Sequence, residues 1–351
     1  MCIRDRYLLV IGSAKSGTSS LFRYLADHPD VAGASLKETY FFSPDFDYRD
    51  QHGANDPISA FEAYFDHATE GQLRVEATPF TMYGDGAAER IAANLDDVRV
   101  LCLAREPVAR FVSDYRFLKQ RDSLGEDVPS PDEFAEQQLA ESTAAKNTLA
   151  IGRYADVLPR FVDALGADRV DVAFFEELTA DPAVEMERIA VAYGLAPGFF
   201  NDYDFKIINK TIVVGNPIIN TMRMKVEGPV RVVRNKVLGH ERAHQLFERV
   251  VDAGRMGLEK MSEASNAEEE TFSAESLAAL AEHYQTPNAQ LAEIAGRALP
   301  DESGGTVHSP TPPNNSKRPD AKCGETLKGR PDGAALAILL RGLGSNQRPA
   351  D

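Results

Sequence analysis

The stretch VIGSAKSGTSSLF, residues 10–22, constrains the fold of this chain more than any other part of its sequence. It joins an apolar run, YLLVI at 7–11, to a glycine-rich turn, after which Leu21, Phe22 and Leu25 recur at helical spacing. A continuous apolar run is typical of a strand buried on both faces of a parallel sheet. The stretch therefore predicts a strand, a backbone loop that can bind an anion, and the amino end of a helix.

The rest of the chain repeats this alternation. Apolar runs predict three further core strands, at 73–79, 98–104 and 169–175. Helical patterns lie at 86–95, 107–119, 131–142, 154–165 and 182–194. Strands that alternate with helices indicate an α/β fold, here a P-loop-like doubly wound parallel sheet flanked by helices and built as a single domain.

Local signals mark the ends of two helices. Ser130 and Glu133 form a capping-box pattern around a proline, which predicts that a helix begins there. An amphipathic helix pattern covers 273–299, with Ser273 as its expected N-cap and Gly296 near its end.

Composition limits the class of partner. The 351 residues carry a net charge of -16 with 43% hydrophobic and 26% charged residues, which is typical of a globular protein. A protein that tracks nucleic acid needs a surplus of Lys and Arg, so no nucleic-acid partner is expected. Cys2, Cys102 and Cys323 form no metal-binding or disulfide pattern. Together with the lack of a run of about 20 apolar residues, this predicts a cytoplasmic protein with no transmembrane segment and no metal.

Three segments depart from the main pattern. Residues 1–6 have no evident role and are interpreted as a candidate non-native N-terminal scar, which leaves 7–300 as the domain. Residues 301–351 are rich in Pro, Gly, Ser and Asn and are predicted to be a disordered low-complexity tail. Residues 206–242 hold eight Lys or Arg against two acids, which fits either a solvated basic face or a flap near an anionic ligand.

The glycine-rich turn is not a Walker A sequence. In P-loop nucleotide hydrolases the lysine follows the second glycine and reaches the β and γ phosphates. Here Gly12 and Gly17 have the right separation, but Thr18 takes the place of the lysine, and the lysine is Lys15. The backbone of the loop can still bind phosphate. A Walker B strand would end in an acid that helps to hold Mg²⁺, whereas the third predicted strand ends in Arg105, which favours a second phosphate there.

Together these motifs resemble the sulfotransferases that use 3′-phosphoadenosine 5′-phosphosulfate (PAPS), most closely the heparan-sulfate-type branch and its bacterial relatives. The similar segments include GSAKSGTSSLFRYLADHP, KETYFF, AREPVARFVSDY, GRYADVLPRF and LAALAEHYQTPNAQLAEIAG. The resemblance implies a metal-independent transfer of a sulfuryl group from PAPS to a hydroxyl or amine of a saccharide or small-molecule acceptor. The product of the cofactor would be adenosine 3′,5′-bisphosphate.

Carried over by position, the resemblance assigns two groups of cofactor-binding residues. The group at the 5′-phosphosulfate comprises Lys15, Ser16, Gly17, Thr18 and Ser19. The group at the 3′-phosphate comprises Arg105 and Ser113.

Sulfuryl transfer needs a positive charge at the leaving oxygen and a base for the acceptor proton. The ammonium of Lys15 suits the first role, while Thr18 and Ser19 can hydrogen-bond phosphate oxygens. Glu38 occupies the position of the catalytic glutamate of heparan-type members. Desolvation by the aromatic residues 40–42 would raise the pKa of Glu38 and favour its action as a base. The alternative is that Glu38 pairs with a nearby lysine or caps a turn.

Further residues are candidates for an acceptor or cofactor pocket. They are Lys37, Glu76, Thr78, Tyr154, Asn209 and Lys210. The competing interpretation is strand-end hydrogen bonding for Glu76 and Thr78, and core packing for Tyr154. His28, at a helix end in LADHPD, is interpreted as structural.

Two other classes of function are open from the sequence. A P-loop kinase or NTPase is disfavoured by the displaced lysine and the missing acid, and it would turn over ATP with Mg²⁺. A non-catalytic nucleotide- or glycan-binding protein on the same scaffold would bind the bisphosphate without transferring sulfate. The sequence identifies neither the acceptor, nor O- or N-sulfation, nor the oligomeric state.

Overall fold

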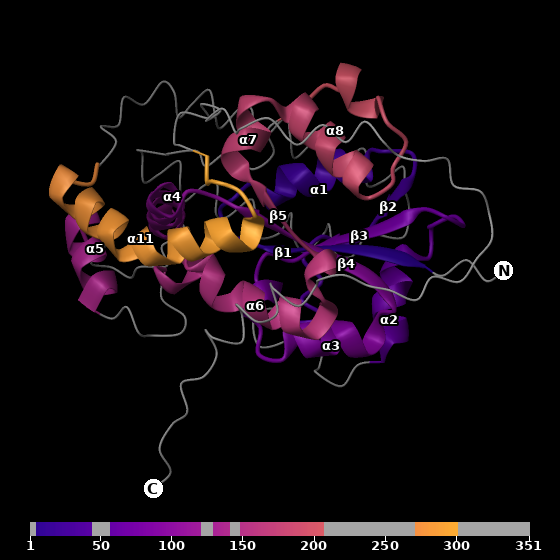
Figure 1. The fold of residues 1–351 in the computed structure, drawn as a ribbon, viewed down its shortest axis with the longest axis horizontal. Coiled ribbons are helices and arrows are strands. Elements are labelled where there is room, and N and C mark those ends of the chain that lie inside the picture. Colours follow the sequence, from indigo (N-terminus) through magenta and orange to yellow (C-terminus); the bar gives the residue numbers. More distant parts are fainter. Residues whose placement is uncertain (1–4, 44–56, 121–128, 141–147, 207–270, 301–351) are drawn as a thin grey trace, which may run out of the picture. The chain divides into compact units, whose positions relative to one another are not determined.

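A parallel sheet of five strands organises the residues that the computed structural model describes, which are 5–43, 57–120, 129–140, 148–206 and 271–300. The strands are β1 (Arg6–Gly12), β2 (Val31–Gly33), β3 (Leu73–Ala77), β4 (Asp97–Ala104) and β5 (Val170–Phe174). Their spatial order is β2-β3-β1-β4-β5, and every neighbouring pair is parallel. The predicted α/β fold with a doubly wound parallel sheet is confirmed (Figure 1).

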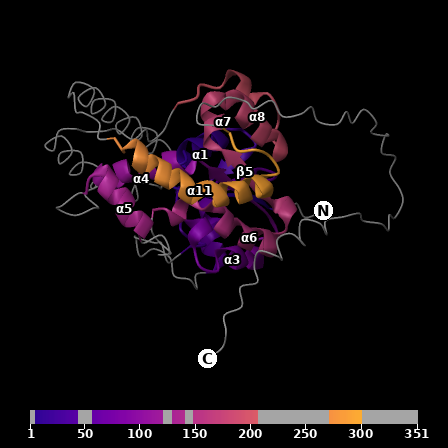
Figure 2. The same ribbon diagram turned by 60° about the vertical axis from the view of Figure 1, so that its left-hand side comes forward.

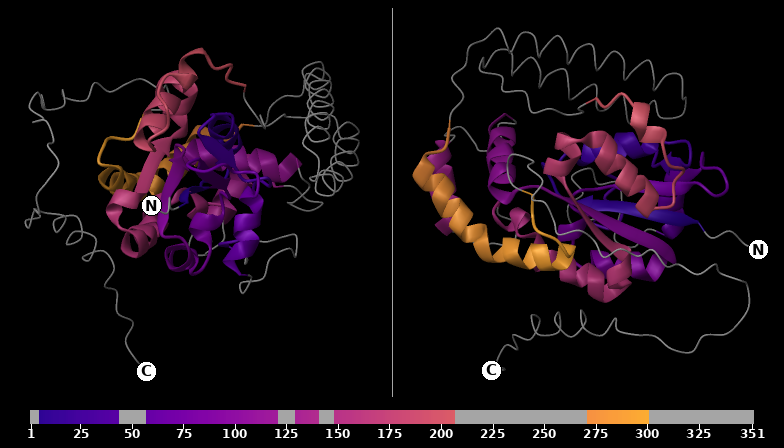
Figure 3. Two further views of the ribbon diagram at one scale, coloured as in Figure 1. Left: turned by 90° about the vertical axis from the view of Figure 1, so that its right-hand side faces the viewer. Right: turned by 45° about the horizontal axis from the view of Figure 1, so that its top comes forward.

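Helices cover both faces of this sheet (Figure 1). On one face lie α1 (Thr18–Ala26), α7 (Phe175–Ala180) and α8 (Pro182–Ala192). On the other lie α2 (Ile58–Glu62), α3 (Ala87–Asn94) and α6 (Tyr154–Leu165). The right-hand view of Figure 3 also shows strands of the sheet with helices on either side of them.

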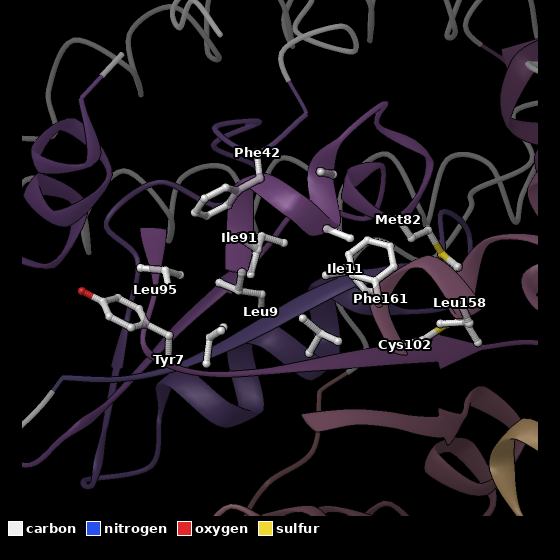
Figure 4. Packing of buried hydrophobic residues seen from close by; sticks show 14 of the residues in the cluster. Tyr7, Leu9, Ile11, Phe42, Met82, Ile91, Leu95, Cys102, Leu158 and Phe161 are labelled. Atoms are coloured by element: carbon white, nitrogen blue, oxygen red, sulfur yellow. The ribbon is translucent and has the colours of Figure 1, made fainter. Parts of the chain in front are cut away.

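Each face of the sheet has its own hydrophobic core. Leu8 and Val10 of β1 pack in the cluster of α1 and α8. Leu9 and Ile11 pack in the cluster of α3 and α6, shown in Figure 4. Since successive residues of a strand point to opposite faces, a strand covered on both sides must be apolar throughout, which explains the run at 7–11.

A third cluster lies beside the sheet, where α4 (Pro107–Gln120), α5 (Pro131–Ala140) and α11 (Ala274–Ala295) pack together (Figure 2). Its buried aromatic residues are Phe111, Tyr115, Phe134, Phe272 and Tyr284. This cluster supports α4 from the side away from the sheet.

The predicted helix ends are confirmed. Ser130 N donates to Glu133 Oε2 at 2.8 Å, and Glu133 N donates to Ser130 Oγ at 3.4 Å, which is the predicted capping box. Ser273 Oγ accepts from Ser276 N at 3.1 Å, and Gly296 ends α11 with a left-handed φ of 66°.

Other features differ from the sequence prediction. The elements that the sequence did not predict are β2, α2, α7 and the 3₁₀ helices Ala63–Phe65, Thr81–Tyr83, Ala150–Gly152, Ala167–Arg169 and Phe199–Asp202. β1 begins at Arg6, one residue before the predicted start of the domain: Arg6 pairs with Leu73 and Asp97, and Asp5 forms an ion pair with Arg74. The interpretation of residues 1–6 as a non-native segment stays a prediction. The predicted tail at 301–351, and 207–242 of the basic segment, lie outside the described residues.

Candidate active site

Three neighbouring strands end at the edge of the sheet where the predicted anion loop lies. The loop 13–17 follows β1, Arg105 follows β4, and Phe175 follows β5. β1 and β4 are neighbours in the sheet. After β1 the chain continues to β2 on one side of this pair, and after β4 it continues to β5 on the other side. In open α/β sheets such a switch point, outside the carboxyl ends of the strands, is where ligands bind.

The loop after β1 is held from inside by two buried serines. Ser13 Oγ lies 2.5 Å from Ser16 Oγ, and Ser13 N donates to Leu103 O at 2.9 Å. Both serine side chains are fully buried, so the Ser16 hydroxyl takes part in the internal bonding of the loop, and a contact of Ser16 with the cofactor stays a prediction. The groups of this loop that can bind a ligand are therefore its backbone N–H groups and the side chains of Thr18 and Ser19, which follow it.

The amino end of α1 is built by a glycine that no other residue can replace without strain. Gly17 is the N-cap, with a φ of 83° and no side-chain cap. A Cβ at this position would lie 3.0 Å from the Phe175 ring. Lys15 also has a positive φ, of 69°. The first turn of α1, with Thr18 and Ser19, thus forms a helix amino end of the kind that attracts anions.

Arg105 is fixed against this loop from two sides. Its Nη1 donates to Lys15 O at 3.0 Å, and its guanidinium lies 4.6 Å from the centroid of the Phe175 ring. Burial lowers the pKa of Arg105, an effect that the charge of Glu176 opposes. Within the described part of the chain, Arg105 Nε is buried without a hydrogen-bond partner. A half-buried cation whose buried Nε has no hydrogen-bond partner among the described residues, beside an anion loop, fits a phosphate group.

The Tyr154 hydroxyl joins the two loops. It donates to Arg105 O at 2.9 Å, accepts from Arg105 N at 3.3 Å, and accepts from Ser13 Oγ at 3.3 Å. Tyr154 is 1% exposed and packs in the core of α3 and α6. The core packing that was the competing interpretation of Tyr154 is thus observed, and its place in a cofactor or acceptor pocket stays a prediction.

Tyr154→Phe is expected to lower the free energy of unfolding by about 1–3 kcal/mol, because it leaves the buried N–H and C=O of Arg105 without their partner. The measurement is urea denaturation. Tyr203→Phe is the matched control, since it removes an exposed hydroxyl bond to Asp27 and should cost little. Equal losses in both variants would contradict the joining role of Tyr154.

The helix after β4 brings the last predicted cofactor residue to the same place. Glu106 caps α4 through bonds from Val108 N (3.0 Å) and Ala109 N (2.6 Å). Lys15 Nζ lies 4.0 Å from the centroid of the Phe117 ring. Ser113 precedes Phe117 by four residues on α4, so the two positions share one face of the helix, and a contact of Ser113 with the cofactor stays a prediction.

Glu38 lies at the same edge, at the end of β3. Its backbone N donates to Ala77 O at 3.1 Å, and its Oε1 lies 2.5 Å from Lys37 Nζ. The side chain is 38% exposed, while Phe42 packs in the core instead of enclosing the carboxylate. The structure therefore shows Glu38 paired with a lysine, which was the alternative to its role as a base, and that role stays a prediction.

The remaining candidates are placed as follows. Glu76 and Thr78 are buried and bonded to each other, as strand-end hydrogen bonding predicts. Asn209 and Lys210 lie outside the described residues. His28 is 1% exposed, and its Nδ1 accepts from Asp30 N, so its structural interpretation is confirmed.

The sequence did not identify two aromatic contacts, those of Phe117 with Lys15 and of Phe175 with Arg105. Neither has a local signal, because a phenylalanine at helical or strand spacing looks like a core residue.

The described residues contain neither a group of metal ligands nor a membrane-spanning helix. None of their His, Cys, Asp and Glu side chains gather in groups of three or more that could hold a metal ion. Among the helices that can be described, none is long and apolar enough to span a bilayer.

A parallel sheet whose central strands end in a glycine-rich loop, a helix amino end and a half-buried arginine has the arrangement of P-loop-like folds, in which phosphate groups bind at this edge. The chain belongs to the sulfotransferase domain family, whose model matches residues 5–203. The family predicted from the motifs is thereby confirmed.

Individual relatives agree with this assignment. The chain is 29% identical over 189 residues to mouse (Mus musculus) heparan sulfate glucosamine 3-O-sulfotransferase 3A1, a match of 53% of this chain and 45% of that protein. It is 36% identical over 110 residues to the membrane-associated sulfotransferase kil1 of Dictyostelium discoideum, 31% of this chain and 22% of that protein. The chain thus spans about half or less of the length of these relatives.

A solved structure shows the same fold. The crystal structure of a sulfotransferase from Alicyclobacillus acidocaldarius superposes with a TM-score of 0.55 at 23% sequence identity. The superposition covers 84% of this chain and 97% of that one.

Proposed function

We propose that this chain is a PAPS-dependent sulfotransferase that sulfates a hydroxyl or amine of a saccharide or small-molecule acceptor. One observation carries the proposal: the backbone of Lys15 and the side chain of Arg105 are bonded to each other, so two cations stand at one edge of the sheet. PAPS carries phosphate groups at both ends of its nucleoside. Membership of the sulfotransferase family supports the same conclusion.

The residues present fit this cofactor. Arg105, whose buried Nε has no bonded partner among the described residues, would bind the 3′-phosphate together with Ser113. The first turn of α1, with Thr18 and Ser19, would bind the 5′ end. Bound PAPS supplies the sulfuryl group that is transferred. Lys15 places a positive charge where negative charge develops, so we propose that the reaction needs no metal.

Glu38 is proposed to accept the acceptor proton on its carboxylate. Lys37 Nζ, 2.5 Å from Glu38 Oε1, would hold this carboxylate in place at the edge of the sheet. The acceptor itself is proposed to be a saccharide, because the heparan sulfate enzyme named above acts on a sugar. Localisation in the cytoplasm is proposed on the dispersed cysteines alone.

Isothermal titration with adenosine 3′,5′-bisphosphate tests the cofactor, and transfer of labelled sulfate from PAPS to saccharides, phenols, lipids and amines tests the reaction. Folded protein that does not bind the bisphosphate would overturn the proposal. Binding without transfer to any acceptor would favour a non-catalytic binding protein. Mg²⁺-dependent ATP turnover would favour a kinase or NTPase instead.

Arg105→Ala is expected to weaken binding of the bisphosphate about 10- to 100-fold, because hydrogen bonds to charged groups contribute about 1.5–3 kcal/mol. Arg105→Lys should recover part of the loss, since it keeps the charge but loses the planar fork. Titration calorimetry measures both.

Arg99→Ala is the matched control for this measurement. Arg99 lies in β4, the strand that leads to Arg105, and its guanidinium lies 4.8 Å from the centroid of the Tyr193 ring. The Arg99 side chain is bonded to Asp171 and to the carbonyl of Ala192. Its loss should leave the affinity unchanged. An Arg105→Ala variant that binds as tightly as the wild type would remove Arg105 from the site.

A further inference from the structure

The loop that carries Glu38 has an uncommon backbone. Glu38 and Tyr40 have φ angles of 63° and 57°, in the left-handed region that non-glycine residues rarely adopt. Such residues persist only where the surroundings hold them, and they are concentrated at functional sites. The question is which group holds this loop.

Four successive backbone N–H groups of the loop are bound, directly or through one hydroxyl, to the end of β3. Glu38 N donates to Ala77 O at 3.1 Å, and Thr39 N donates to Glu76 Oε1 at 3.1 Å. Tyr40 N donates to Thr78 Oγ1 at 3.3 Å. The N–H of residue 41 donates to Thr39 Oγ1 at 3.3 Å.

Both threonine hydroxyls pass these bonds on to one carboxylate oxygen. Thr78 Oγ1 donates to Glu76 Oε1 at 2.5 Å, and Thr39 Oγ1 donates to the same oxygen at 3.2 Å. Glu76 Oε1 therefore accepts three hydrogen bonds, and it is linked to the N–H groups of residues 39, 40 and 41. A carboxylate suits this position because every group that faces Oε1 is a donor.

Glu76 is also coupled to the charged pair that the loop displays. Glu76 is 2% exposed, and burial raises its pKa, an effect opposed by the bonds from Thr78 and Thr39 and by the charge of Lys37. The ammonium of Lys37 lies 2.5 Å from Glu38 Oε1. One lysine thus interacts with the buried carboxylate and with the exposed one.

We propose that Glu76, through Thr39 and Thr78, is a positioning residue that sets the backbone of the loop at 38–41 and so the place of the Glu38 carboxylate. This inference rests on the proposed sulfotransferase activity. Since Glu76 and Thr78 are almost fully buried, they act through Glu38 and Lys37 and do not touch the substrate.

The main test is Thr78→Val, which removes the hydroxyl and leaves Tyr40 N without its acceptor. We expect kcat to fall roughly 10- to 100-fold, the range that a displaced catalytic group can cost. The affinity for adenosine 3′,5′-bisphosphate should not change, because the bonds described above join residues 38–41 to the end of β3, whereas the cofactor is proposed to bind at Arg105 and the first turn of α1. Thr78→Ser should restore most of the lost rate. Thr69→Val, in the exposed turn before β3, is the matched control and should leave kcat unchanged.

A double-mutant cycle separates positioning from a merely structural effect. If Thr78 acts through Glu38, Thr78→Val should have little further effect on kcat in a Glu38→Gln background. Additive losses, or a loss of bisphosphate affinity in parallel with kcat, would overturn the inference. Glu76→Gln can replace Thr78→Val in the same double-mutant cycle. If the Glu76→Gln protein does not fold, the threonine variants still test the inference.

The two proposals fail in different ways. A wild-type chain that neither binds the bisphosphate nor transfers sulfate would overturn the proposed function. An active wild type in which the losses from Thr78→Val and Glu38→Gln add would overturn only the role of Glu76.

Discussion

Lys15→Ala is expected to lower the rate of sulfuryl transfer about 10²- to 10³-fold, the usual cost of removing one group that stabilises a developing negative charge. The ammonium is the part of Lys15 that performs this role. Alanine keeps a Cβ at the left-handed φ of 69°, so the change adds no backbone strain of its own. The measurement is kcat with labelled PAPS, together with titration of the bisphosphate.

Two further variants at this position separate charge from packing. Lys15→Met keeps the aliphatic stem beside Phe117 but removes the charge, so it should be as slow as Lys15→Ala. Lys15→Arg keeps a charge and should retain more activity. Lys119, in the last turn of α4, also lies over a ring, 5.9 Å from the centroid of Tyr115, and Lys119→Ala should leave kcat unchanged. A Lys15→Met enzyme with the wild-type rate would contradict the electrostatic role.

Glu38→Gln is expected to lower kcat about 10²- to 10⁴-fold, because a general base accelerates a reaction by about this factor. The affinity for the bisphosphate should not change, since the proposed base does not contact the phosphates of the cofactor. The amide is nearly the same size as the carboxylate, so packing is kept. Steady-state kinetics at saturating PAPS and acceptor measures the loss.

The ion pair between Glu38 and Lys37 allows a second explanation of why Glu38 is a carboxylate. If Glu38 only balances the charge of Lys37, Glu38→Gln should leave kcat almost unchanged. Glu70→Gln, in an exposed turn before β3, controls for the loss of one surface carboxylate. Full activity of Glu38→Gln would therefore assign the base to another group.

Local signals in the sequence were sufficient for the parts of the fold that are contiguous in the chain. The anion loop joins β1 to α1 within one stretch, and α6 has the bounds that its pattern predicted, 154–165. The sequence did not predict β2, because a strand of three residues is too short to show a periodic pattern. It did not predict α7 either, because this helix follows β5 directly, with no turn residues between them.

The details of the site depend instead on contacts between distant residues. The motif placed Lys15 and Arg105 correctly at one edge, since the carboxyl ends of neighbouring parallel strands meet there. It could not show that Phe117 and Phe175 lie against these cations, or that Glu38 pairs with Lys37. Which side chains meet across a loop is decided by packing, and packing leaves no periodic trace in the sequence.

The helix α4, which carries Ser113 and Phe117 to the anion loop, is supported from behind by α11. The family match ends at residue 203, whereas α11 begins only at Ala274. A gene fragment cut at the family boundary would thus encode the whole anion loop but not the helix that backs α4.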